Sequence, residues 1–219
     1  MSGGPDGDRR RLLTFLLLVL TVLSGLIDAV SILSLGHVFV ANMTGNLVFV
    51  SLGLAGAPQF SVATSLVALG GFAVGILFSR TALTRFGPPI VLMSAAAGCQ
   101  TALLAAATAL HALAGPRHVL VLICAVAMGI QNATAGRVGI GGLTTTVMTR
   151  TLVGLIGDIG APTRNRGVAL RQALSVAALV AGALVGGLLV LLVTPPAALG
   201  AATGCALLVA GTATVAARR

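Results

Sequence analysis

Charged side chains are rare in this chain of 219 residues, which has only four acids and thirteen basic residues, all of them Arg. Two of the acids lie close to the N-terminus. Asp28 instead lies within a long apolar run, about 25 Å beyond Arg11 if the run is helical. A carboxylate at that depth in a membrane is costly unless it is paired or hydrated, so its default interpretation is functional.

Two kinds of role are open for Asp28. As a functional group, it could bind a cation or carry a coupling proton. As a structural group, it could pair with Arg137 or Arg150, or cap backbone that is interrupted within the membrane. The equivalent place in the second half of the chain holds Asn132, which keeps the hydrogen-bonding capacity but cannot ionise.

A second group of polar residues stands where two short apolar stretches begin, close to Thr44 and Thr149. A Gly-containing break precedes each, which predicts extended backbone over 37–43 and 143–147. Such backbone survives at membrane depth only when it is buried in protein or lines a wet cavity. The N-terminus of a short helix there presents unpaired N–H groups that suit an anion or a polar ligand. The alternative is a structural plug in which Thr and Asn side chains cap each other. The candidate solute-binding residues are Asp28, Asn42, Thr44, Asn46, Asn132, Thr145, Thr149 and Arg150.

Other chemistries have little support in the sequence. The three Cys lack CxxC spacing, and no His/Cys cluster, carboxylate pair or Ser-His-Asp set indicates an enzyme, a metal or a cofactor. His37 lies in the first break, where we favour a packing role over titration at the site. Asp158, near Arg164 and Arg166, is typical of a surface ion pair. A nucleic-acid partner is not expected, because the Arg residues are dispersed and no aromatic platform accompanies them.

The elements that position these residues are membrane helices. Hydrophobic residues make up 57% of the chain and the mean hydropathy is +1.09, too apolar for the surface of a water-soluble domain. About 20 apolar residues cross a bilayer. Six stretches meet that length, at 12–35, 60–84, 89–110, 119–140, 168–193 and 197–217. Two others, 44–56 and 148–160, are too short and are predicted to be re-entrant half-helices in this all-α integral membrane fold.

The arginines favour six crossings over eight. With six, only Arg117 falls outside and the other twelve are cytoplasmic or dip in from that face, in agreement with the positive-inside rule. We therefore expect both termini in the cytoplasm, a tail over 1–11 and one transmembrane domain over 12–217. The basic, then apolar N-terminus also resembles a cleavable secretory signal, but the apolar run continues to Leu35, which favours an uncleaved span.

The two halves of the chain resemble each other. Gly25-Leu-Ile-Asp-Ala29 matches Gly129-Ile-Gln-Asn-Ala133, and residues 43–48 match 148–153. Since each unit, 12–111 and 118–217, has three long crossings, the second must enter the membrane from the opposite side. Two GxxxG ladders, at 71–75 and 182–186, indicate close helix crossings or a dimer face.

At 25–29, 40–46 and 129–134 the chain resembles the YoaK-type family of small bacterial membrane proteins, which is classed by a domain of unknown function. The likeness runs from about Leu12 to Arg219. It implies a bacterial inner-membrane protein of about six spans with no assigned activity. By looser analogy, extended segments followed by two facing half-helices look like the substrate centre of the sulfate and nucleobase transporters.

Inverted repeats with broken helices favour a secondary transporter of a small polar or anionic solute. A channel, or a membrane scaffold or sensor that does not transport, is the alternative. The expected partners are the lipid bilayer, this solute and, as a further expectation, a second copy in a homodimer.

Overall fold

A computed structural model of the chain describes residues 5–140, 145, 148–157 and 166–218. Within these ranges the chain is helical and contains no strand. Its helices are α1 (Pro5–Ser34), α2 (Met43–Leu54), α3 (Val62–Thr81), α4 (Pro89–Ala112), α5 (Arg117–Val138), α6 (Met148–Gly157), α7 (Arg166–Leu192) and α8 (Pro195–Ala217), with a short 3-10 helix at Leu83–Arg85. The fold is therefore all-α, as the sequence predicts.

Six of these helices are long and apolar enough to cross a membrane: α1, α3, α4, α5, α7 and α8. They coincide, within a few residues at each end, with the six predicted spans, which confirms a multi-pass membrane protein. Helix α2 has 12 residues and α6 has 10, lengths of about 18 Å and 15 Å that fall short of the hydrocarbon core. One boundary differs from expectation: α1 already begins at Pro5, so most of the expected tail over 1–11 continues the first helix.

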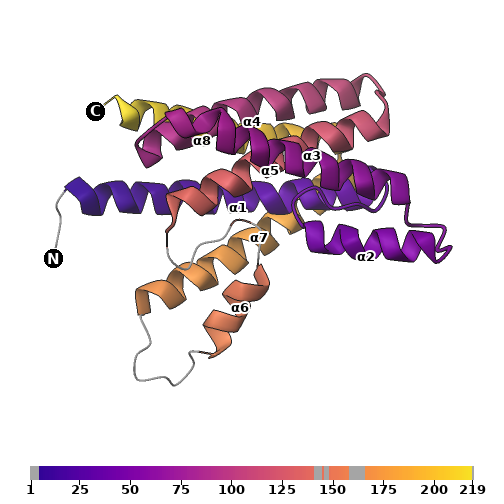
Figure 1. Cartoon of the computed structure of the whole chain (residues 1–219), viewed down its shortest axis with the longest axis horizontal. Helices are drawn as coiled ribbons and strands as arrows, with labels where there is room; N and C mark the ends of the chain where they lie inside the picture. Colours follow the sequence, from indigo (N-terminus) through magenta and orange to yellow (C-terminus); the bar gives the residue numbers. More distant parts are fainter. Residues whose placement is uncertain (1–4, 141–144, 146–147, 158–165, 219) are drawn as a thin grey trace.

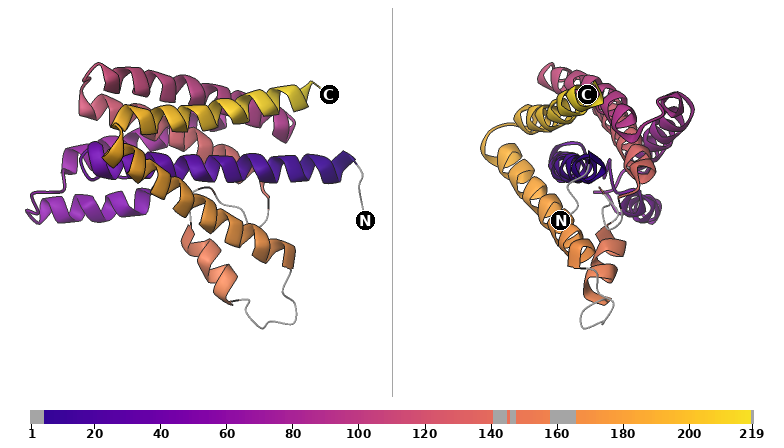
Figure 2. Two further views of the ribbon diagram at one scale, coloured as in Figure 1. Left: turned by 180° about the vertical axis from the view of Figure 1, so that it is seen from behind. Right: turned by 90° about the vertical axis from the view of Figure 1, so that its left-hand side faces the viewer.

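Helix α1 lies inside the molecule. It packs against α7 and α8, while α3 packs against α5, and α4 packs against both α5 and α8. Figure 1 shows the two ends of the chain at the same end of the long axis, and the end-on view of Figure 2 shows α1 surrounded by other helices. The interior is apolar, with fully buried side chains such as Leu16, Leu23 and Ile27 along α1.

Glycines let two helix pairs approach at the backbone. A Cβ atom on Gly25 of α1 would collide with the carbonyl oxygen of Leu179 in α7, and one on Gly182 would collide with that of Val22. Packing that close leaves no room for a side chain, so glycine is required at the crossing.

The crossing of α3 and α5 is built in the same way. A Cβ on Gly129 would collide with the carbonyl oxygen of Phe72, and one on Gly75 with that of Val126. The packing interpretation of both GxxxG ladders is therefore confirmed, because their glycines face neighbouring helices of the same chain.

A buried polar network joins three helices. Gln100 of α4 donates to Oε1 of Gln131 in α5 at 2.7 Å, and Gln131 donates to Ser24 Oγ in α1 at 2.8 Å and to the Leu20 carbonyl at 3.1 Å. These side chains are about 1% exposed or less. A buried network whose members are hydrogen-bonded specifies one packing of the helices, so we assign these residues to the scaffold.

Candidate functional site

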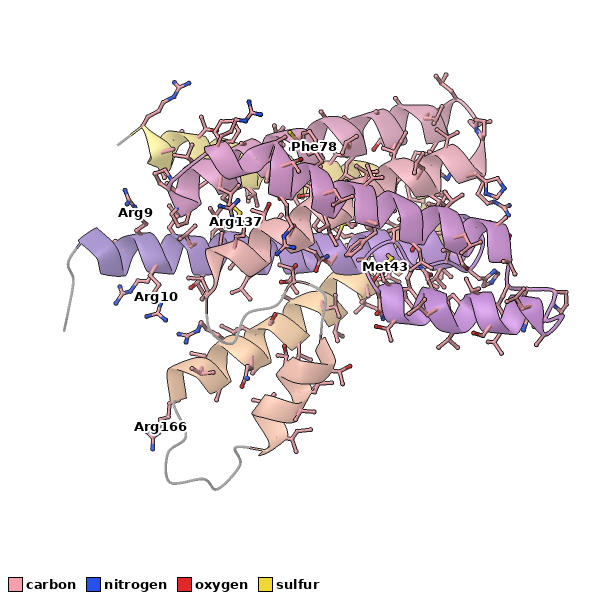
Figure 3. The ribbon with its side chains drawn as sticks, in the orientation of Figure 1. Arg9, Arg10, Met43, Phe78, Arg137 and Arg166 are labelled. Atoms are coloured by element: carbon pink, nitrogen blue, oxygen red, sulfur yellow. The ribbon has the colours of Figure 1, made fainter. Side chains whose placement is uncertain are left out.

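The two short helices begin at one cavity of about 900 Å³. Its walls come from α1, the chain between α1 and α2, and helices α2, α3, α5, α6 and α7. The lining residues are Asp28, Ala41, Asn42, Met43, Thr44, Gly45, Val48, Phe72, Ile76, Arg80, Asn132, Ala133, Gly136, Arg137, Thr149 and Leu179. Met43 marks the start of α2 in Figure 3.

Five of the eight candidate residues lie on this cavity: Asp28, Asn42, Thr44, Asn132 and Thr149. Asn46 and Thr145 do not line it. Arg150 belongs to α6, but its side chain lies outside the described residues, as do Asp158, Arg164 and the second break over 143–147 apart from Thr145.

Asp28 holds the first break in place. Its Oδ1 accepts a hydrogen bond from the backbone N–H of Ala41 at 3.2 Å, and the backbone of Val40 also bonds to this carboxylate. The chain over 35–42 is not helical, so these N–H groups have no helical partner. The geometry therefore matches the capping alternative, in which the carboxylate satisfies interrupted backbone. The same side chain also lines the cavity.

The first turn of α2 faces the cavity through Met43, Thr44 and Gly45. Asn42 occupies the N-cap position, but its side chain makes no capping hydrogen bond and is exposed. Asn42 is therefore the N-cap residue by position, without a side-chain cap. Without a capping side chain, the first N–H groups of α2 remain available to a ligand or to water, at the positive end of the helix dipole.

Asn46 serves the break and not the cavity. It is fully buried, accepts from the Phe39 backbone N–H at 2.9 Å and donates back to the Phe39 carbonyl. The Phe39 ring lies over Gly45 so closely that a Cβ there would collide with it. It also stacks on Phe49, with ring centroids 5.5 Å apart, and Phe49 stacks on Phe60 at 4.6 Å. These contacts fix α2 to the break before it and to the loop after it.

Two arginines at the cavity were not among the candidates. Arg80 lies in the last turn of α3 and Arg137 in the last turn of α5, and both line the cavity. Arg9 marks one end of the molecule in Figure 3. Along the long axis, Arg137 lies between Arg9 and Met43. Sequence reasoning counted both among the twelve arginines that are cytoplasmic or dip in from that face, and it considered Arg137 only as a partner of Asp28. Among the described residues, no ion pair joins Asp28 to either arginine, so the structure does not show the alternative in which Asp28 pairs with Arg137.

The other polar residues singled out from the sequence differ in their surroundings. Asn132 lines it and donates to the Met128 carbonyl at 3.1 Å. Thr145 is buried, and its hydroxyl oxygen has no hydrogen-bond partner among the residues that the structure describes. His37 is exposed with a left-handed backbone, at φ 53°. His118 lies with its Nδ1 3.5 Å from the hydroxyl of Thr64, near the opposite end of the molecule.

Comparison with known proteins gives a family and no activity. The model of the family described as "Protein of unknown function (DUF1275)" matches residues 16–212. The UPF0700 transmembrane protein YoaK of Bacillus subtilis (strain 168) is 35% identical over 148 residues, which cover 66% of this chain and 66% of that protein. No solved structure matches the chain significantly. With the match spanning most of its length, the chain belongs to the DUF1275 family of transmembrane proteins, of which YoaK is a relative.

Proposed function

We propose that this protein is a secondary transporter whose cavity binds a small polar or anionic solute. The observation that carries the proposal is that one cavity is lined by the first turns of both short helices, by Arg80 and Arg137, and by the Asp28/Asn132 pair. Two helix N-termini and two guanidinium groups around one space favour negative charge.

An inverted repeat is part of the proposal, and the packing of the helices supports it. If α1 to α4 correspond to α5 to α8, then the α1–α7 contact corresponds to α5–α3, and α1–α8 corresponds to α5–α4. Both members of each pair are observed, as are the corresponding contacts α2–α3 and α6–α7. Such pairing is the pattern expected when two halves are related by a twofold axis.

The register of the glycine crossings gives the same correspondence residue by residue. Gly25 in α1 corresponds to Gly129 in α5, at an offset of 104, and Gly75 in α3 corresponds to Gly182 in α7, at an offset of 107. With these offsets, the four backbone collisions described above map onto one another in pairs. Corresponding registers in two separate helix pairs support a duplication over chance similarity between apolar sequences.

The cavity lies between the proposed repeats. Three corresponding pairs line it: Asp28 with Asn132, Thr44 with Thr149, and Phe72 with Leu179. Transporters built from inverted repeats bind their solutes at the repeat interface, where discontinuous helices end. In this arrangement α2 and α6 are re-entrant and enter from opposite faces.

The same model gives the orientation. Both termini lie at one end of the molecule, and α3 and α5 run towards that end, with Arg80 and Arg137 in their last turns (Figure 1). Arg117 begins α5 at the other end. Because positive residues favour the cytoplasm, we place both termini on the cytoplasmic side of a bacterial inner membrane.

The test begins with the thermal unfolding of purified protein in detergent against a panel of small anions and metabolites, since a ligand of the folded state raises its stability. The best stabiliser is then followed in proteoliposomes. Saturable exchange supports a transporter, and linear flux indicates a channel. A stabilising solute without any flux indicates a sensor. Arg137→Gln should weaken binding while Arg85→Gln, outside the cavity, should not. If no solute stabilises the protein or crosses the membrane, the proposal is wrong.

A further inference from the structure

The cavity is lined by basic and acidic side chains, and they come from different helices. Of the described side chains that line it, Arg80 and Arg137 are cations, and Asp28 contributes one negative charge when it is ionised. The two guanidinium groups come from α3 and α5, which pack against each other, and the carboxylate comes from α1. The cavity is therefore positive by one charge, before the N-terminal turns of α2 and α6 are counted.

The basic side of the cavity suits one anionic group. Guanidinium groups present paired donors that match a carboxylate, and the uncapped first turn of α2 adds backbone N–H groups. Hydrogen bonds between ionised donors and acceptors are stronger than those between neutral groups. One anionic group leaves the occupied cavity neutral.

The Asp28 side requires something different from the solute. A carboxylate has about four acceptor sites, and Ala41 and Val40 use part of them. An ionised carboxylate cannot donate, so a group that meets it must carry a hydroxyl or ammonium donor. A second anionic group on the solute would be repelled by it.

We propose that the cavity selects small solutes with one anionic group and a separate hydrogen-bond donor, as in a hydroxy- or amino-carboxylate. The donor meets Asp28, and the anionic group meets Arg80, Arg137 and the first turn of α2. This inference rests on the proposed function and names the class of solute that the same cavity takes. Simple monoanions bind more weakly because they offer Asp28 no hydrogen-bond donor. Dianions are rejected because Asp28 repels the second anionic group.

The test compares four sodium salts or zwitterions at equal ionic strength: glycolate, glycine, acetate and malonate. The affinity of each is measured from the thermal unfolding of the purified protein as a function of concentration. The expected order places glycolate and glycine above acetate, and malonate last. Equal affinities for glycolate and acetate, or malonate as the tightest ligand, would overturn the inference while leaving the proposed function in place. If none of the four binds, the inference fails, and the wider solute panel decides the proposed function separately.

Variants of the cavity residues test the inference further, because they should change the affinities for acetate and glycolate differently. Asp28→Asn removes the repulsion and the acceptor charge together, so acetate should bind more tightly and the preference for glycolate should disappear. Arg80→Gln and Arg137→Gln should each weaken glycolate about tenfold or more, the usual worth of a charge-assisted hydrogen bond. Arg85→Gln, at the same end of the molecule but outside the cavity, is the matched control and should change nothing. Equal weakening of acetate and glycolate in Asp28→Asn would mean that Asp28 acts only through the backbone. The comparison of probes in the unmodified protein decides the inference even if a variant does not fold.

Discussion

The two short helices reach the same cavity but are held differently. Helix α2 is fixed by the Asn46 bonds to Phe39, by the stack of three Phe rings and by packing against α3. Helix α6 packs against α7, where Gly154 lies against the Gln172 side chain. Most of its other side chains are exposed.

The difference shows which features the two proposed repeats share. Both keep a Thr in the first turn on the cavity, at Thr44 and Thr149. The position of Asn46 is taken by Thr151, which has no amide to bond a backbone N–H and C=O together. The position of Gly45 is taken by Arg150, so a ring cannot lie there as Phe39 does. We infer that both helices direct their N-termini at the cavity, whereas the Asn46–Phe39 bonds and the Phe stack belong to α2.

The largest effect is expected at Asn46. In Asn46→Ala, two buried backbone groups of Phe39 lose their partners, which should reduce the free energy of unfolding by about 2–4 kcal/mol. Thr151→Ala, at the corresponding place in α6, should cost about 1 kcal/mol. Thermal and denaturant unfolding in detergent measures both. Asn42→Ala is the control, because that side chain makes no capping bond. Equal losses at positions 46 and 151 would contradict the difference in anchoring.

A smaller effect is expected from filling space against the two helices. Gly45→Ala pushes a methyl group into the Phe39 ring, which the stack holds in place, and should cost about 1–3 kcal/mol. Gly154→Ala meets only the amide end of Gln172, which can rotate away, and should cost less. Gly157→Ala has open space and is the control. Unfolding temperatures of the three variants are compared, and a more severe loss at Gly154 than at Gly45 would reverse the account.

The smallest effect is expected at the ring stack. Phe49→Leu keeps most of the apolar volume but removes two stacking contacts, at a cost of about 1 kcal/mol. Local protection should fall with it, so hydrogen exchange of the amides over 36–54 should rise while that of α4 stays the same. Faster exchange throughout the molecule would instead indicate a general loss of packing.

The sequence predicted the helices better than the site. Six apolar runs separated by Pro and Gly set the spans, because length and hydropathy alone determine whether a helix can cross a bilayer. Asp28, Thr44 and Thr149 were predicted from position, since polar residues in apolar sequence stand out. Asn46 was assigned to the solute, although it binds backbone. No sequence rule separates an Asn that faces a cavity from one that faces the chain seven residues earlier.

Arg80 and Arg137 were missed for a related physical reason. A basic residue at the end of a span satisfies the positive-inside rule and the helix dipole whether or not it faces a cavity. Only the packing of α3 against α5 brings both onto one space.

The central claim is that the first turns of α2 and α6 face one cavity. It is tested by placing cysteines at Thr44 and Thr149 in a protein freed of Cys99, Cys124 and Cys205, and treating membranes with a short bifunctional maleimide. The account predicts an intramolecular cross-link for this pair. It predicts none when the second cysteine is placed at Gly157, at the far end of α6, and Thr149 is left unchanged. Absence of a cross-link for the Thr44/Thr149 pair, with both cysteines shown to react singly, would contradict it.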